Sequence, residues 1–68
     1  MLKIGDKIKE LRLEKGLSQM QLGKMIGASQ KAVDYWERSV NEPKESYIIA
    51  LVNVFGVTFD EFFDNVGN

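Results

Sequence analysis

The feature that most constrains the fold is a very short link between two helical patterns, in the stretch LSQMQLGKMIGASQKAVDYWE. One apolar pattern with helical spacing ends at Ile26, and a second helix begins at Ser29. Only Gly27 and Ala28 lie between them. A two-residue turn that contains Gly leaves no room for two antiparallel neighbours. The two helices are therefore predicted to cross steeply.

The rest of the chain is also helical in pattern, and no stretch shows the alternation of a strand. SQMQ and TFDE are capping boxes that begin the second and fifth helices, and Gly16 and Gly56 are stop signals. Asn41 and Pro43 mark a loop. The predicted fold is all-α, a compact single domain over residues 1–68 with helices over residues 4–15, 18–26, 29–38, 45–55 and 58–65.

Composition excludes several classes of function. The 68 residues include no Cys and no His, so disulfides, thiolate metal sites and the most usual general base are absent. We expect no enzyme activity, no metal, no cofactor and no small-molecule ligand. The longest apolar stretch, YIIALVNVFGV, is interrupted by Asn53 and is too short to span a bilayer, so we expect no membrane contact and a soluble, cytoplasmic protein.

Charge is unevenly distributed, although the net charge is only −1. Residues 1–41 carry eight Lys and Arg against five Asp and Glu, whereas residues 42–68 carry one Lys against five acidic residues. This asymmetry predicts one face that attracts an anion and one that does not.

The stretch KIKELRLEKGLSQMQLGKMIGASQKAVDYWERSVNEP resembles the helix-turn-helix of the phage repressor and Cro family, also called the XRE-type family. IIALVNVFGVTFDEFF is similar to the last two helices of that family. The resemblance covers roughly residues 4–63. It implies a repressor-like five-helix domain, bacterial or phage-encoded in a bacterial host, whose third helix enters the DNA major groove.

A recognition helix needs one face held by the core and another that offers hydrogen-bonding side chains. Gln30, Lys31 and Tyr35 are the candidate base contacts. Gln30 lies in the first turn, where it can bond bidentately to adenine, or it is simply a solvated side chain. Lys31 reads guanine or holds a phosphate. Tyr35 touches a thymine methyl, donates to a phosphate, or covers the edge of the core.

The predicted phosphate contacts are Gln19, Ser18, Ser29, Lys9, Asn41 and Lys44. In the family, the residue at the position of Gln19 holds a phosphate and often braces the first side chain of the recognition helix, here Gln30. Ser29 is first of all a helix cap. Family resemblance also implies an ion pair between Arg12 and Glu37 that is structural. The predicted core residues are Trp36, Leu22, Leu11, Ile48, Leu51 and Phe55.

Three departures from the family pattern affect this interpretation. Asp34 lies beside the outward face and repels phosphates unless it accepts from cytosine or pairs with Lys31 or Arg38; the Arg38 pair is the default expectation. Ser39-Val40 replaces the usual Gly and basic residue, so Lys44, Asn41 and backbone amides must contact phosphate instead. Leu13 and Val54 are apolar where relatives are usually polar. With the other apolar residues of the C-terminal half, they form either a larger core or a surface for self-association.

The leading hypothesis is a sequence-specific regulator of transcription, a repressor that binds a double-stranded DNA operator with an inverted repeat as a homodimer that is weak without DNA. The predicted dimer interface comprises Val40, Val54, Phe59, Phe63 and Val66. The alternative is a protein-interaction module, such as an antitoxin or a bridging factor, in which DNA binding is secondary. Net acidity and Val40 favour that alternative, while the basic first helix and Gln30-Lys31 favour DNA.

Overall fold

The computed structural model describes residues 4–63, and within that range it contains five helices and no strand. They are α1 (Ile4–Glu14), α2 (Gln19–Ile26), α3 (Gln30–Glu37), α4 (Glu45–Phe55) and α5 (Phe59–Phe63). The predicted all-α, five-helix fold is confirmed. The first helix ends one residue earlier than predicted, and the expected end of the last helix at residue 65 lies outside the described residues.

Local capping explains where the helices begin. Ser18 and Thr58 each form a complete capping box, with Gln21 and Glu61 respectively, as predicted. The Ser29 hydroxyl accepts a hydrogen bond at 3.0 Å from the backbone N–H of Ala32 and so caps α3. These contacts depend only on residues three apart in sequence, which is why the sequence pattern located them.

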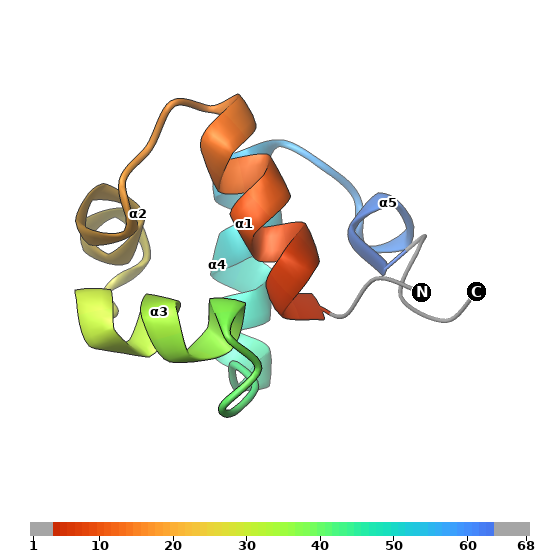
Figure 1. Ribbon diagram of the computed structural model, residues 1–68. Coiled ribbons are helices and arrows are strands. Elements are labelled where there is room, and N and C mark those ends of the chain that lie inside the picture. Colours follow the sequence, from red (N-terminus) through yellow and green to blue (C-terminus); the bar gives the residue numbers. More distant parts are fainter. Residues whose placement is uncertain (1–3, 64–68) are drawn as a thin grey trace.

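The turn between α2 and α3 depends on Gly27, which has a left-handed backbone with φ 78°. Only Gly adopts this conformation without steric cost. Because the turn is so short, α2 and α3 cross steeply, and among the helices of residues 4–63 they share the most extensive contact. Figure 1 shows α2 end-on beside α3, which lies along one outer edge of the fold.

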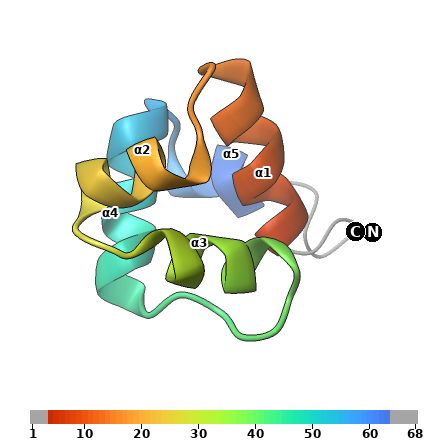
Figure 2. The same cartoon turned by 60° about the vertical axis from the view of Figure 1, so that its left-hand side comes forward.

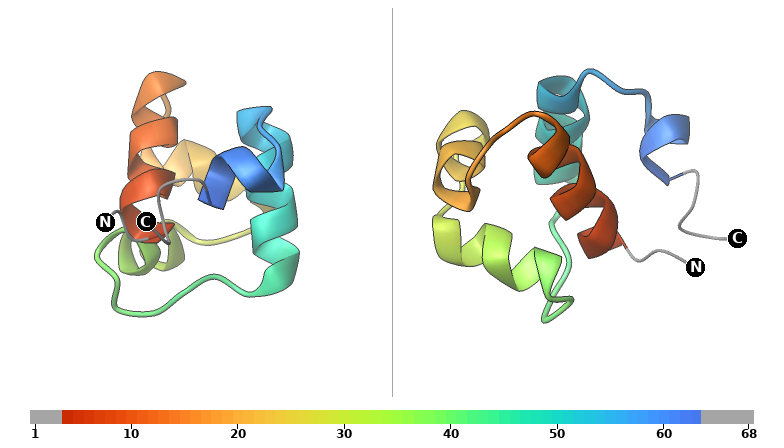
Figure 3. Two further views of the ribbon diagram at one scale, coloured as in Figure 1. Left: turned by 90° about the vertical axis from the view of Figure 1, so that its right-hand side faces the viewer. Right: turned by 45° about the horizontal axis from the view of Figure 1, so that its top comes forward.

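The remaining helices hold α3 in place from behind. In Figure 2, α3 runs along the lower edge of the molecule, and the loop to α4 passes below it. Both views of Figure 3 keep α3 at that edge, and its right-hand view shows α5 on the opposite side of α1 from α2. The second helix of the helix-turn-helix is therefore supported from one side and open on the other.

The core lies where α1, α2, α3 and α4 meet, and α5 closes it with Phe62. Its buried apolar residues are Ile8, Leu11, Leu22, Val33, Trp36, Leu51, Val52, Phe55 and Phe62. Five of the six predicted core residues are in this set. Ile48 is only half-buried and packs against it. Phe62, which is fully buried, had no clear signal in the sequence because five consecutive residues of α5 include three Phe.

The first helix approaches α3 unusually closely at Gly5. A side chain there would collide with the backbone carbonyl of Trp36. Gly23 similarly faces the carbonyl of Ala28 in the turn. Gly5 lets α1 lie directly against α3, and Gly23 lets the turn lie directly against α2, so the position of α3 is set by backbone contact as well as by side chains. Within residues 4–63, none of the helices has the length and apolar character needed to cross a membrane.

Candidate nucleic-acid interface

The third helix has one buried face and one open face. Val33 and Trp36 are buried in the core, and the Trp36 ring lies 5.2 Å from the ring of Tyr47 on α4. Gln30 and Lys31 are exposed in the first turn of α3. Tyr35 is half-buried. The predicted division of α3 into an anchored side and a polar side is therefore present in the structure.

Two cations flank the ring of Tyr35. The Lys31 Nζ atom lies 5.6 Å from the ring centroid, and the Arg38 Cζ atom lies 5.4 Å from it. Cation–π contacts at such distances attract each cation to the ring face, by about 0.5–1 kcal/mol at exposed sites. The role of Arg38 beside Tyr35 was not predicted, although their spacing of three residues on one helix face was visible in the sequence.

A groove of about 490 Å³ lies between α3 and the segment that leads into α4. Its lining residues are Ser29, Lys31, Ala32, Tyr35, Trp36, Asn41, Glu42, Lys44 and Tyr47. Five predicted DNA contacts therefore surround one concave surface. Tyr47, which the sequence analysis did not assign to the site, closes the α4 side of the groove.

The start of α4 is the one N-terminus of α2, α3 and α4 without a side-chain cap. Its N-cap residue, Lys44, has an extended backbone, and its side chain makes no capping hydrogen bond. The first N–H groups of a helix have no partner within the helix, and they favour an anion. Exposed Lys44 and Asn41 thus accompany backbone donors at this edge of the groove.

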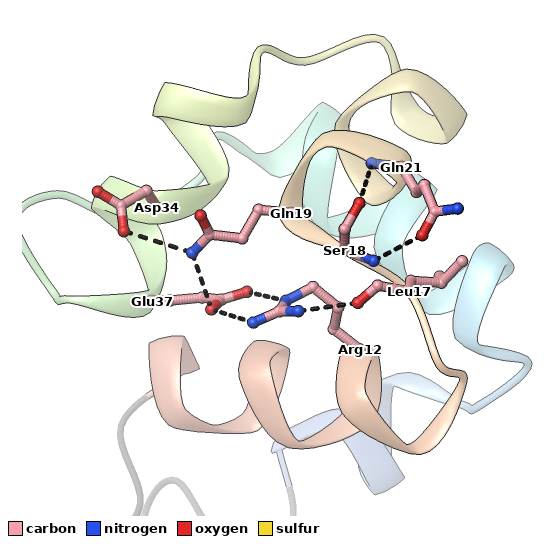
Figure 4. A network of polar contacts seen from close by, with 7 residues as sticks. All are labelled: Arg12, Leu17, Ser18, Gln19, Gln21, Asp34 and Glu37. Carbon is pink, nitrogen blue, oxygen red and sulfur yellow. Dashed lines mark hydrogen bonds and ion pairs between the residues drawn. The ribbon is translucent and has the colours of Figure 1, made fainter.

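A buried ion pair joins α1 to the end of α3, as predicted (Figure 4). The Arg12 Nε atom lies 2.7 Å from Glu37 Oε2, and the second guanidinium contact, to Oε1, measures 3.0 Å. Arg12 also donates to the carbonyl of Leu17 at 2.8 Å. The hydrogen bond to Glu37 raises the pKa of Arg12, although burial opposes this effect. The guanidinium therefore remains charged in the folded protein.

Gln19 extends this network from α2 to α3. Its Nε2 atom donates to Asp34 Oδ1 at 3.3 Å and to Glu37 Oε1 at 3.2 Å (Figure 4). The expectation that Gln19 braces Gln30 is wrong in this structure. Two carboxylates bind the amide hydrogens because hydrogen bonds to an ionised acceptor are stronger than those between two amides.

Asp34 pairs with Arg38, which confirms the default expectation. The Arg38 Nε atom donates to Asp34 Oδ2 at 3.0 Å, and the Nη2 atom lies at the same distance from that oxygen. This pair is largely open to solvent, with side-chain exposures of 58% for Arg38 and 37% for Asp34. It differs in this respect from the buried pair beneath it.

Other predicted phosphate contacts lie on different parts of the surface. Lys9 is exposed on α1, outside the residues that line the groove. Ser18 is exposed at the start of α2, where its hydroxyl is engaged in the capping box. The structure therefore brings Ser29, Lys31, Tyr35, Asn41 and Lys44 together, but it does not place Lys9 or Ser18 with them.

The predicted dimer interface is only partly exposed. Val40, Phe59 and Phe63 are exposed, with Val40 at 57%. Val54 is half-buried against the core, so it is not the surplus surface residue that the sequence suggested. Val66 lies outside the described residues. The loop that carries Val40 contains Ser39 with φ 61°, a left-handed conformation that favours Gly.

Comparison with known proteins agrees with the fold and this site. A family model described as helix-turn-helix matches residues 8–62, and the chain therefore belongs to the helix-turn-helix family. Over 48 residues the chain is 40% identical to the Repressor protein C2 of Salmonella phage P22, a match that covers 71% of this chain and 22% of the phage protein. Over 63 residues it is 30% identical to an uncharacterized HTH-type transcriptional regulator of Rickettsia prowazekii, covering 93% of this chain and 48% of that protein. The chain spans about a fifth and about half the length of these curated relatives.

Solved structures show the same likeness. The crystal structure of the P22 c2 repressor with a synthetic operator matches with a TM-score of 0.85 and 32% identity, covering 91% of this chain and 94% of that chain. The solution structure of the DNA-binding domain of the P22 c2 repressor matches with a TM-score of 0.87 and 31% identity, covering 94% and 84%. The predicted phage repressor-like family is confirmed, and the relatives agree with the predicted class of DNA-binding transcriptional regulators.

Proposed function

We propose that the chain is the sequence-specific, double-stranded DNA-binding part of a transcriptional regulator, with α3 as its recognition helix. The observation that carries this proposal is that Val33 and Trp36 fix one side of α3, while Gln30, Lys31 and Tyr35 face the other. The major groove of B-DNA admits a helix of this kind and distinguishes all four base pairs. Its relatives include a repressor solved with an operator, which supports repression as the outcome. The chemistry is binding, and no catalytic step is part of it.

The groove beside α3 supports a division of labour between base contacts and phosphate contacts. Gln30 and Lys31 read base edges, and Tyr35 contacts a thymine methyl or a phosphate. Lys44, Asn41 and the uncapped start of α4 hold the backbone of one strand. Lys9, Ser18 and Ser29 are further phosphate contacts. Such a regulator meets its DNA in the cytoplasm of a bacterium or of the host of a phage.

For Gln19, which the family resemblance made a phosphate contact, we infer a role in positioning the carboxylates of α3. Both hydrogens of its amide are donated to carboxylates, so its side chain reaches a phosphate only if one of these bonds breaks. The backbone N–H groups at the start of α2 provide the phosphate contact there instead.

Site selection from random DNA tests the proposal. Gln30→Ala and Lys31→Ala should change the sequence preference, because they remove base contacts. Lys9→Ala and Lys44→Ala are the matched controls, and they should weaken binding to all sequences alike. The salt dependence should be shallow because the chain has only nine Lys and Arg. If the selected profile of Gln30→Ala equals that of the wild type, the assignment of Gln30 as a base contact is wrong.

The regulator is proposed to bind as a homodimer on an inverted repeat, because one α3 reads too few base pairs to select a site in a genome. Val40, Phe59 and Phe63 supply exposed apolar surface for a small contact that is weak without DNA. Sedimentation on a full operator should show two chains per duplex. Val40→Lys with Phe63→Lys should abolish cooperative binding but retain contacts to a half-site. One chain per saturated operator would rule out the dimer.

The alternative is a protein-interaction module, such as an antitoxin or a bridging factor. It is favoured by one observation: α5 exposes Phe59 and Phe63 next to the acidic Asp60 and Glu61. Retention on nonspecific DNA at low salt separates the two functions. A protein that passes unretained through immobilised DNA at low salt would support the interaction module.

A further inference from the structure

We propose that Asp34 is a further specificity-determining residue, and that its Oδ1 atom accepts a hydrogen bond from the amino group of a cytosine in the major groove. The inference rests on the proposed function, because it requires α3 to enter that groove. It assigns a base contact to a carboxylate that would otherwise only repel DNA.

The position of Asp34 places it beside the proposed base contacts. It follows Gln30 by four residues, so the two side chains are neighbours on the surface of α3. The Asp34 side chain is 37% exposed, so part of it is open to solvent. Asp34 is therefore placed to contact a base pair next to the one that Gln30 contacts.

The carboxylate of Asp34 is held in place before any DNA arrives. Gln19 Nε2 donates to Oδ1 at 3.3 Å, and Arg38 contacts Oδ2 at 3.0 Å. The same Gln19 nitrogen donates to Glu37, whose own orientation is set by the buried pair with Arg12. Figure 4 shows Arg12 of α1 bound to Glu37 of α3, and Gln19 of α2 bound to both Glu37 and Asp34 of α3. A side chain fixed in this way loses little further freedom when it binds a base.

Its hydrogen-bonding capacity is not exhausted by these contacts. A carboxylate offers about four acceptor sites. Both Arg38 contacts fall on Oδ2, whereas Oδ1 receives only the Gln19 amide. Oδ1 therefore retains one acceptor site. An ionised carboxylate can only accept, so it suits the N4 amino group of cytosine and is repelled by the O6 and N7 atoms of guanine and the O4 atom of thymine. Adenine also offers an amino group, N6, but its N7 acceptor lies beside that group and repels the carboxylate, so cytosine is favoured.

Arg38 removes the electrostatic objection to a carboxylate near phosphates. Its guanidinium pairs with Asp34 and also lies against the Tyr35 ring, which limits its motion. The pair brings no net charge to the DNA. Asp34 thus contributes a preference for one base. Arg38 contributes the positive charge that offsets the repulsion between Asp34 and the phosphates of the DNA.

Site selection from random DNA with wild type, Asp34→Asn and Asp34→Ala tests the inference, and Arg38→Ala is the matched control. The wild type should enrich cytosine at one position per half-site, next to the position that Gln30→Ala alters. Asp34→Ala should lose this preference at that position alone, by about tenfold. Arg38→Ala should retain the cytosine and bind all sequences more weakly, because the carboxylate loses its counter-charge.

The outcomes separate this inference from the proposed function. If Asp34→Ala leaves the profile unchanged and binds every sequence more tightly, Asp34 only repels phosphates and the inference is overturned. Loss of preference in Gln30→Ala but not in Asp34→Ala retains the proposed function and rejects this contact alone. If the wild type selects no sequence at all, the proposed function fails first, and the Asp34 assignment falls with it.

Discussion

The α1–α3 half of the molecule and the α4–α5 half are held together by different kinds of contact. In the first half, a polar network of Arg12, Gln19, Asp34 and Glu37 ties three helices to one another. In the second half, α4 has no side-chain cap, and apolar side chains such as Phe62 hold the helices to the core. Buried apolar side chains hold both halves to the shared core, and the α1–α3 half adds contacts that depend on direction.

This difference matches what each half must do. Burial of apolar area is non-directional, so it stabilises a fold without defining how a helix is rotated. Hydrogen bonds and ion pairs need specific angles and distances. The half that presents α3 to a ligand therefore contains the directional contacts. The α4–α5 half supports α3 through the core, and its beginning also supplies Lys44 and Tyr47 to the groove.

The largest expected effect on the free energy of unfolding comes from the α4–α5 half. Phe62→Ala should lower the free energy of unfolding by about 4 kcal/mol, because it removes a fully buried ring from a small core. Phe63→Ala is the matched control, since the neighbouring ring is 38% exposed, and it should cost far less. Urea denaturation measures both. Similar losses for the two variants would show that α5 does not close the core in the way described.

In the α1–α3 half, Glu37→Gln should lower the free energy of unfolding by about 3 kcal/mol, because Arg12 would then be a buried charge without its counter-ion. Arg38→Ala breaks an Arg–carboxylate pair that is exposed, so it should change stability by only about 0–1 kcal/mol. Thermal denaturation of both variants makes this comparison. Equal melting midpoints for wild type and Glu37→Gln would contradict the structural role of the pair. The sequence preference of the folded fraction should not change.

Helix capping should give a smaller difference in the free energy of unfolding between two matched variants. Ser29→Ala should destabilise the protein by about 1 kcal/mol, because the N–H of Ala32 loses its acceptor. Ser46→Ala is the control in the uncapped α4, where the exposed Ser46 is not the cap residue. Chemical denaturation should resolve the first change and show almost none for the second. A loss at Ser46 as large as that at Ser29 would mean that α4 is capped after all.

The smallest expected effect is an increase in the free energy of unfolding. Ser39→Gly is expected to raise the free energy of unfolding by about 0.5–1 kcal/mol, because it relieves a left-handed backbone at φ 61°. Gly27→Ala is the reciprocal change at φ 78°, where an added Cβ meets open space, so any loss reports backbone strain alone. Calorimetry should show melting temperatures that shift in opposite directions. A lower midpoint for Ser39→Gly would show that its left-handed conformation carries no strain.

The sequence by itself determined the features that arise from neighbouring residues. Capping contacts join residues three apart, and the turn at Gly27 needs two residues, so the helix starts and the steep crossing of α2 and α3 follow from short patterns. The spacing on α3 likewise predicted which face would be buried. Family resemblance supplied the Arg12–Glu37 pair, whose members are 25 residues apart.

Only the tertiary structure determined which partner a side chain contacts when its possible partners lie far away in the sequence. Family resemblance gave Gln19 a phosphate and Gln30 as expected partners, and the packing of α2 against α3 placed its amide on two carboxylates instead of on Gln30. Val54 and Phe62 are as apolar in the sequence as Val40 and Phe63. The packing of α4 and α5 on the core buries Phe62 and half-buries Val54, whereas Val40 and Phe63 remain exposed. Apolar character shows that a side chain can be buried, but only the three-dimensional contacts determine whether there is a surface to bury it against.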